Sequence, residues 1–173
     1  PNDLPWPSAN VRLHYTQREQ VAPQQFGEAV YPIQTRWTGH LSYRFGGKRP
    51  KSSNHYVSQT VDVYATQIQA QDTFGRATTE YGEPYPLPFE LQLNRSTTGC
   101  QLKTLHNSRG TFEANVCMLK AQHGSYVVTL QMALAPDETA ANWPPLVETV
   151  QNRLLVAAEK QIRNCEGNAA CLP

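Results

Sequence analysis

Four cysteines, Cys100, Cys117, Cys165 and Cys171, are the residues of this 173-residue chain whose chemistry is most constrained by their spacing. The stretch CQLKTLHNSRGTFEANVC has turn residues at its centre, so a hairpin would set Cys100 opposite Cys117 within disulfide reach. Cys165 and Cys171 bracket the short loop CEGNAAC, which can close easily. We therefore expect two local disulfides, and hence a periplasmic or extracellular protein. Zinc is the alternative interpretation, but the chain has no C-x-x-C and no histidine at ligand spacing.

The other reactive residue types show no arrangement typical of catalysis. The five histidines fall on expected strands and turns, where solvent exposure is their usual state, and the carboxylates are scattered. The chain contains no G-x-S-x-G motif, and FGGKRPK lacks the spacing of a phosphate-binding loop. Oxidised cysteines would not be nucleophiles. We expect a protein that is not an enzyme and that has no metal site and no cofactor.

Two loops carry the residues that could contact a partner. One holds a cluster of cations and the other, EYGEPYPLPF, is rich in tyrosine and proline. Cations can bind an anionic partner, and tyrosine is favoured at protein interfaces because it is large, rigid and half polar. The alternatives are a solvated loop that blunts aggregation, and tyrosines that pack over a sheet edge. The candidate contact residues are Arg44, Lys48, Arg49, Lys51, Tyr81 and Tyr85.

Composition narrows the class of protein. The net charge is +1, so nothing global favours nucleic acid, and no apolar run approaches the length of a membrane span. The chain begins PNDLPWPSAN without Met, which we interpret as the start of a mature chain whose export signal has been removed; the alternative is a cytosolic fragment. A peripheral membrane association through the removed N-terminus stays open. Its length fits a single domain, residues 1–173.

The elements that must position these residues are mainly strands. IQTRWTGHLSYRF, residues 33–45, alternates apolar and polar side chains, and YVSQTVDVYATQIQ continues the pattern as its antiparallel partner. Residues 1–10 are expected to be an extended arm, and residues 17–32 and 72–86 to be loops. Further strands are expected in VRLHYT, LPFELQLN, the cysteine hairpin and YVVTLQMALA. The short stretch QLKTL fits least well and is expected to be an edge or bulged strand.

One long helix is expected near the end of the chain. Pro144 and Pro145 suit a first helical turn, and Val147, Val150 and Leu154 recur at helical spacing. The domain would then comprise strands over 11–135, a helix over 144–164 and a stapled tail over 165–173. This order predicts an α+β fold: an antiparallel sheet of about six or seven strands with one long C-terminal helix packed on one face.

The helix is too narrow for the sheet that it should cover. Seven strands spaced ~4.8 Å apart are roughly 30 Å wide, whereas a helix is only ~10 Å across. Curling, the loop at 17–32, a ligand or a partner protein would have to close the rest. Our hypothesis is an exported, non-catalytic binding protein: an inhibitor or immunity protein that sterically blocks a toxic or degradative enzyme in the periplasm. The alternatives are a carrier of an apolar ligand and an envelope assembly protein.

Overall fold

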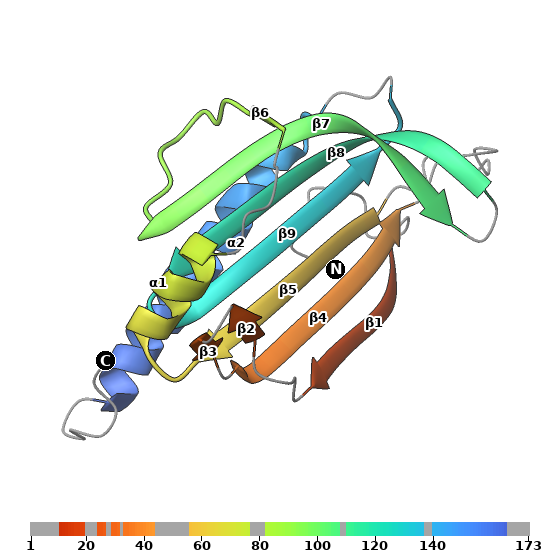
Figure 1. Cartoon of the computed structure of the whole chain (residues 1–173). Helices are drawn as coiled ribbons and strands as arrows, with labels where there is room; N and C mark the ends of the chain where they lie inside the picture. Colours follow the sequence, from red (N-terminus) through yellow and green to blue (C-terminus); the bar gives the residue numbers. More distant parts are fainter. Residues whose placement is uncertain are drawn as a thin grey trace.

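The computed structural model describes the chain as one antiparallel sheet with two helices (Figure 1). The described residues are 11–19, 24–26, 29–31, 33–43, 56–76, 82–107, 110–136 and 140–165. The elements are β1 (Val11–Glu19), β2 (Gln24–Phe26), β3 (Ala29–Tyr31), β4 (Ile33–Tyr43), β5 (Tyr56–Tyr64), α1 (Gln67–Arg76), β6 (Glu83–Pro84), β7 (Arg95–Asn107), β8 (Gly110–His123), β9 (Tyr126–Leu134) and α2 (Trp143–Cys165).

The main sheet contains seven strands in the order β1-β4-β5-β9-β8-β7-β6, and all neighbours in it pair antiparallel. β6 contributes only two residues, so six strands form nearly all of the sheet. β2 and β3 form a separate two-stranded sheet. The expected pairing of the strand that begins at Ile33 with the strand that begins at Tyr56 is confirmed as β4 and β5.

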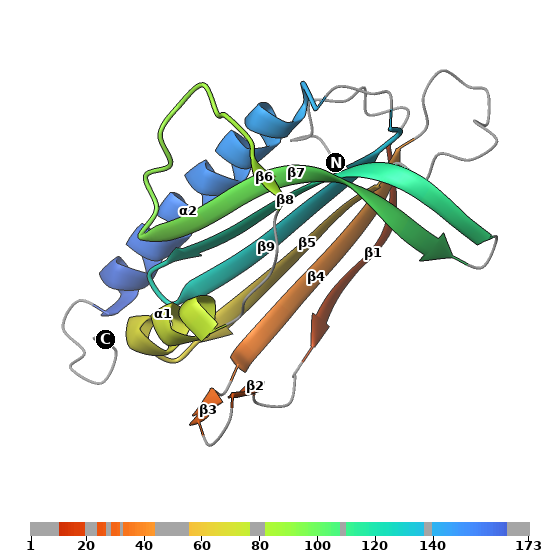
Figure 2. The same cartoon turned by 45° about the horizontal axis from the view of Figure 1, so that its top comes forward.

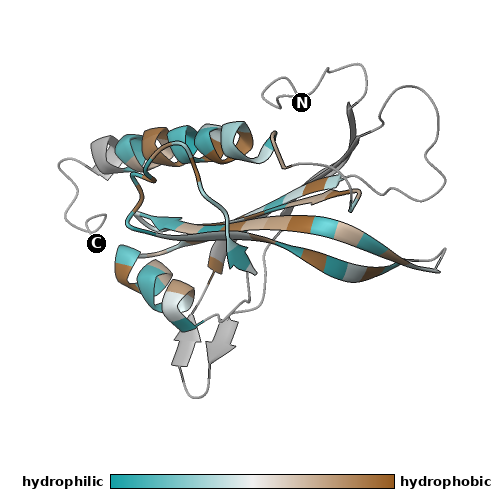
Figure 3. Ribbon diagram, turned by 90° about the horizontal axis from the view of Figure 1, so that it is seen from above, coloured by the Kyte–Doolittle hydropathy of each residue, from teal (hydrophilic) through white to brown (hydrophobic). Residues whose placement is uncertain are grey.

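The two helices lie on opposite faces of the sheet, as Figure 3 shows edge-on. Strand alternation explains why both faces can be covered. In β9, Val128 and Leu130 belong to the main core beneath α2. Val127 belongs to a smaller core on the other face, together with Tyr64 of β5 and Ala70 of α1. The predicted α+β fold with a long C-terminal helix on one face is therefore present, and a second helix covers part of the other face.

Part of the apolar face that one helix could not cover is closed by the chain itself. Beside α2, an extended segment at 85–93 packs its apolar residues against the main core. The sequence predicted a strand here, and this was wrong: the segment keeps its alternation but lies on the sheet instead of in it. Pro86 and Pro88 supply no backbone donor for a ladder. The Gln92 N–H instead donates to Gln151 Oε1 of α2, at 2.7 Å.

Other expected loops contain regular structure. The stretch 17–32 was expected to be a loop, but β1 extends to Glu19, and β2 and β3 follow. The expected loop at 72–86 contains the end of α1 and all of β6. α1 was missed because YATQIQ continues the alternation of β5. Its start is visible in Thr66, whose Oγ1 accepts a hydrogen bond from the Gln69 N–H at 3.2 Å, as at a helix N-cap.

α2 agrees closely with the expected helix over 144–164. It begins one residue earlier, at Trp143, with Pro144 and Pro145 in its first turn, where helical N–H groups have no intrahelical partner. Trp143 is fully buried and Val147, Val150 and Leu154 face the core. The tail that follows Cys165, and the arm expected at 1–10, lie outside the described residues.

Candidate functional site

The β7–β8 hairpin projects beyond the rest of the sheet (Figure 2). β8 has 14 residues but β9 has only 9, and their pairing ends where Leu134 lies opposite Asn115. β7 and β8 remain paired out to Asn107 opposite Gly110. We call residues 101–107 and 110–116 the β arm. Most of the β arm therefore consists of two strands alone, without a third strand beside it among the described residues.

A disulfide joins the two strands at the base of the β arm. Cys100 lies directly opposite Cys117, with their Cα atoms 4.0 Å apart and a sequence separation of 17. The predicted pairing of these two cysteines is confirmed. A bond between two oxidised thiols is compatible with an oxidising, exported environment. It also limits how far the two strands can separate, so the hairpin is closed by a covalent bond at the base of the β arm.

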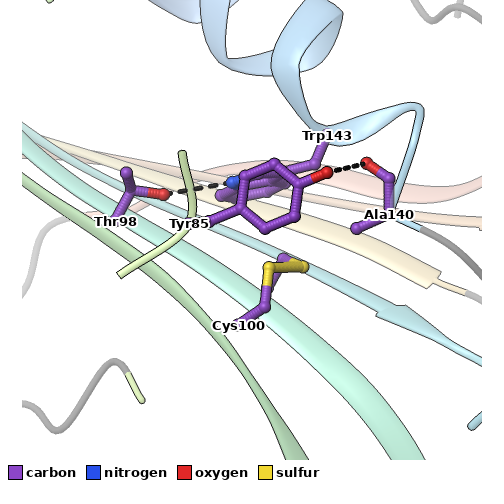
Figure 4. The surroundings of a disulfide bond; sticks show 6 residues. Tyr85, Thr98, Cys100, Ala140 and Trp143 are labelled. Atoms are coloured by element: carbon purple, nitrogen blue, oxygen red, sulfur yellow. Dashed lines mark hydrogen bonds between the residues drawn. A yellow bond between two sulfur atoms is a disulfide. The ribbon is translucent and has the colours of Figure 1, made fainter. Parts of the chain in front are cut away.

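Aromatic side chains pack over this disulfide, as Figure 4 shows. The Trp143 Nε1–H donates to Thr98 Oγ1 at 3.0 Å, and the Tyr85 hydroxyl donates to the Ala140 carbonyl at 3.3 Å. Both aromatic residues belong to the main core or pack against it, together with Cys117, which is fully buried. The segment at 85–93, the start of α2 and the base of the β arm therefore meet at one point, which positions the β arm.

One side of the β arm is exposed and the other is partly buried. Leu102 is 59% exposed, and its neighbours on the same side are also exposed: Thr104, His106, Thr111 and Glu113. On the opposite side, Leu105 and Phe112 pack against buried Ala114 and Val116. Because the cross-strand pairs are regular, each exposed side chain has a defined position. This side can meet a partner with little further ordering.

The projection of the β arm beyond the rest of the sheet was not predicted from sequence. QLKTL was expected to be an edge or bulged strand, and β7 does lie next to the edge, but it pairs with β8 without a register shift. The useful signal was that the alternating apolar stretch of β9 is shorter than the strands of the hairpin before it, so β9 could not pair along their whole length. That signal depends on knowing that the two strands are neighbours, which sequence alone predicts only weakly.

A second cluster of polar residues lies on the α1 face of the sheet. The Arg36 guanidinium makes two hydrogen bonds to the Asp62 carboxylate, from Nε at 2.6 Å and from Nη2 at 2.8 Å. Asp62 is buried, and the paired Arg36 balances its charge. Burial raises the pKa of neighbouring Tyr64 to about 12, so its hydroxyl stays neutral at physiological pH. These groups link β4 and β5 and have a structural explanation.

Two cations of the sheet hold α1 in place. Buried Lys120 donates from Nζ to the Phe74 carbonyl at 3.0 Å, and its ammonium lies 4.8 Å from the centre of the Phe74 ring. The Arg95 guanidinium reaches the Gln71 carbonyl at 3.5 Å. Positive charge is favourable beside the carbonyls of a final helical turn. Burial lowers the pKa of Lys120. We assign this cluster to docking of α1.

Among the described residues, no group of three or more His, Cys, Asp or Glu side chains could hold a metal ion. No helix in the described part of the chain combines the length and apolarity needed to cross a membrane.

Of the six candidate contact residues, only Tyr85 lies in the described part of the chain. Arg44, Lys48, Arg49, Lys51 and Tyr81 lie outside the described residues, as does Cys171, so these predictions stay predictions. Tyr85 is described, and its ring faces the core while its hydroxyl bonds to the Ala140 carbonyl. Tyr85 is therefore partly buried, and the exposed side of the β arm is the candidate contact surface that the described residues offer. No protein family, curated protein or solved structure matches this chain.

Proposed function

We propose that this chain is an exported binding protein without catalysis, an inhibitor or immunity protein that sterically blocks a toxic or degradative enzyme in the periplasm. The observation that carries the proposal is the β arm, which projects past β9 and has a disulfide at its base. The presence of the disulfide favours an oxidising compartment, and the periplasm is one. A projecting element of fixed shape suits the blocking of a cleft.

Rigidity is the physical reason that a β arm suits an inhibitor. Binding costs conformational entropy for each side chain and loop that must become ordered at the interface. Regular pairing along β7 and β8 orders the β arm before it meets a partner, and the Cys100–Cys117 bond prevents its strands from separating at the base. Because less free energy is lost on ordering, a larger part of the favourable contact energy remains as binding free energy. Enzyme–inhibitor pairs of ordinary interface size reach very high affinity in this way.

The chemistry of the exposed side indicates how contact would be made. Leu102 provides an apolar anchor, Thr104 and Thr111 can exchange hydrogen bonds, and Glu113 is the only carboxylate among the exposed residues of that side. His106 Nδ1 lies 2.9 Å from Thr111 Oγ1, which links the strands near the tip. The cations of the loop at 44–51, together with Tyr81, would supply additional contacts under this proposal.

The two alternatives gain less support. A carrier needs space for an apolar ligand between the sheet and α2, but Trp143, Leu146 and the apolar side chains of the segment at 85–93 pack there. An assembly protein would need an extended interaction surface, and the exposed large apolar residues Trp37, Ile68, Leu102 and Val156 are dispersed over different elements. We therefore retain the inhibitor as the proposed function.

The test measures inhibition of purified periplasmic hydrolases by the wild-type protein and by two matched variants. Leu102→Arg places a long charged side chain on the β arm. Val156→Arg introduces the same residue at a similarly exposed apolar position of α2 (66% against 59% for Leu102). For an enzyme that is inhibited, Leu102→Arg should weaken inhibition by about 10-fold or more, because a central apolar contact is lost. Val156→Arg should inhibit like the wild type.

Two results would count against the proposal. A panel that covers the murein, protein, lipid and nucleic-acid hydrolases of the periplasm, with none inhibited and none bound, would contradict the inhibitor function. Inhibition that is equally strong with Leu102→Arg would leave the inhibitor function intact but exclude the β arm as its contact surface.

A further inference from the structure

The Cys100–Cys117 bond lies beneath a cover that two separate elements supply. Cys117 is fully buried, and Cys100 is partly buried against the same core. Trp143 from the start of α2 and Tyr85 from the segment at 85–93 lie over the bond, as Figure 4 shows. The sheet itself lies on the opposite side of the bond. Full access of a dissolved thiol to the sulfur atoms therefore requires one of the two covering elements to move.

α2 is the more firmly held of these two elements. Trp143 is fully buried, and its Nε1–H donates to Thr98 Oγ1 at 3.0 Å. It begins a helix of 23 residues, and Leu146 and Val147 of the next turn are also in the main core. Moving the start of α2 would therefore disrupt the core of the whole domain.

The segment at 85–93 has fewer attachments. It belongs to no helix or strand. Two hydrogen bonds tie it to the rest of the described chain. The Tyr85 hydroxyl donates to the Ala140 carbonyl at 3.3 Å, and the Gln92 N–H donates to Gln151 Oε1 at 2.7 Å. Parts of a protein with few attachments open at the lowest free energy, so this segment should open before α2 does.

The sequence of the segment suits a part that lifts and returns as a unit. Pro86 and Pro88 are exposed, and their rings keep the backbone extended at and before each proline. A chain restricted in this way gains less conformational freedom when it lifts, and it keeps the shape that fits the core. The side chains that must leave the core are partly buried: Tyr85, Leu87, Phe89, Leu91 and Leu93.

We propose that the segment at 85–93 gates thiol access to the Cys100–Cys117 bond, and thereby controls the reduction of this bond. When the segment lifts, a thiolate attacks the sulfur of Cys100, the less buried cysteine. A mixed disulfide forms on Cys100, and Cys117 leaves as a thiolate. A second thiol of the reductant attacks the reductant sulfur of the mixed disulfide and releases Cys100. The two thiols supply two electrons and become a disulfide, and both cysteines take up protons.

The gate sets how quickly the β arm can lose the covalent bond at its base. The bond persists in an oxidising compartment, and in the presence of thiols its reduction is limited by the fraction of molecules in which the segment is lifted. Reduction then removes the restraint on the two strands of the β arm while α2 and the rest of the sheet stay folded. The inference does not rest on the proposed function, because it concerns only access to a bond of this chain.

The test measures reduction of the folded protein by dithiothreitol. Thiols are trapped with N-ethylmaleimide at intervals, and mass spectrometry of peptides follows Cys100 and Cys117 separately from the other cysteines. The bond of the wild type should be reduced about 100-fold or more slowly than that of the urea-unfolded protein. Tyr85→Ala removes the ring above the bond and one hydrogen bond, so reduction should be about 10-fold or more faster than in the wild type.

A matched pair of variants on α2 tests the gate without altering the cover itself. Gln151→Met keeps the side-chain size but removes the acceptor of the Gln92 N–H, so reduction should be about 3-fold to 10-fold faster. Gln161→Met makes the same change on the same helix, where Oε1 accepts from Ser125 and not from the segment. It should be reduced at the rate of the wild type. This pair stays informative if Tyr85→Ala does not fold.

Val127→Ala distinguishes local opening from unfolding of the whole domain. Val127 is buried in the smaller core on the α1 face, so its truncation lowers the free energy of unfolding but leaves the segment in place. Reduction at the rate of the wild type supports the gate. The proposal is overturned if Val127→Ala accelerates reduction as much as Gln151→Met does. It is also overturned if the folded wild type is reduced as fast as the unfolded chain, or if Gln151→Met and Gln161→Met are reduced equally fast.

Discussion

At the residue scale, most polar side chains that the sheet buries have partners, and His123 is one exception, beside the Gln122 side-chain oxygen. His123 lies at the end of β8, and its Nδ1 is buried without a hydrogen-bond partner among the described residues. A buried imidazole nitrogen without a partner disfavours the charged form of the ring. Burial accordingly lowers the pKa of His123 below its ordinary value of 6.5. Protonation of this ring should therefore oppose folding.

The consequence is a pH dependence of stability. The unfolded chain binds the proton on His123 more tightly than the folded protein does. The free energy of unfolding is therefore highest above the unfolded pKa of 6.5 and decreases as the pH falls toward the lower folded pKa. We expect urea midpoints to decrease from about pH 8 to about pH 5 for the wild type and to decrease less for His123→Gln. Identical slopes for the two proteins would exclude His123 as the source.

At the element scale, the chain changes from one face of the sheet to the other around the edge of β7. α1 lies on one face and the segment at 85–93 lies on the other, and β6 is between them in sequence (Figures 1 and 3). Gly82 stands at this crossing with φ of 74°, a conformation that residues with a Cβ rarely adopt. A Cβ at this position would lie 2.6 Å from the Gln101 Cβ. Only glycine fits.

Gly82→Ala should therefore destabilise the protein by about 1–3 kcal/mol, through backbone strain and the clash with Gln101. Gly39→Ala is the matched control, because nothing lies within 4 Å of a Cβ built on Gly39 in strand β4, and its stability should stay close to that of the wild type. Equilibrium urea unfolding measures both variants. Equal midpoints for Gly82→Ala and Gly39→Ala would mean that the crossing can adjust without strain.

At the scale of the whole molecule, the Cys100–Cys117 bond closes the base of the β arm and lies in the core that α2 and the segment at 85–93 share. A disulfide that closes a loop of this size stabilises chiefly by restricting the unfolded chain. Its two cysteines are neighbours across a hairpin, so the same bond also acts locally on the β arm. Stability of the domain and rigidity of the β arm should therefore change together when the bond is removed.

The double variant Cys100→Ala/Cys117→Ala should lose about 3 kcal/mol of unfolding free energy relative to the oxidised wild type, as expected for loop closure. Its β arm should also exchange amide hydrogens faster than β5 and β9 do, since its strands are no longer joined. Chemical denaturation and hydrogen exchange measure the two effects. A loss below about 0.5 kcal/mol would show that packing alone holds the hairpin.

Local patterns predicted much of the fold. Alternation in β4, β5 and β9 identified strands, and the spacing of Val147, Val150 and Leu154 with two prolines before them identified α2. The hairpin turn between Cys100 and Cys117 was enough to predict their pairing. These features succeed because a period of two or 3.6 residues and a short turn are properties of adjacent residues.

Elements whose conformation depends on distant partners were predicted less well. α1 has a polar sequence, and its docking depends on Lys120 and Arg95 from strands far along the chain. LPFELQLN has the alternation of a strand, but its backbone bonds to Gln151 of α2. Sequence alone could not decide between a strand in the sheet and an extended segment on it, because both expose one side and bury the other.

By itself, the sequence determined an antiparallel α+β chain, a disulfide between two hairpin strands and a C-terminal helix, because each follows from side chains close together along the chain. The tertiary structure alone decided that α1 and α2 occupy opposite faces and that the segment at 85–93 completes the main core. It also decided that the paired strands β7 and β8 extend past the end of β9. The reason is that the length and neighbours of each strand are fixed by packing between residues distant in sequence.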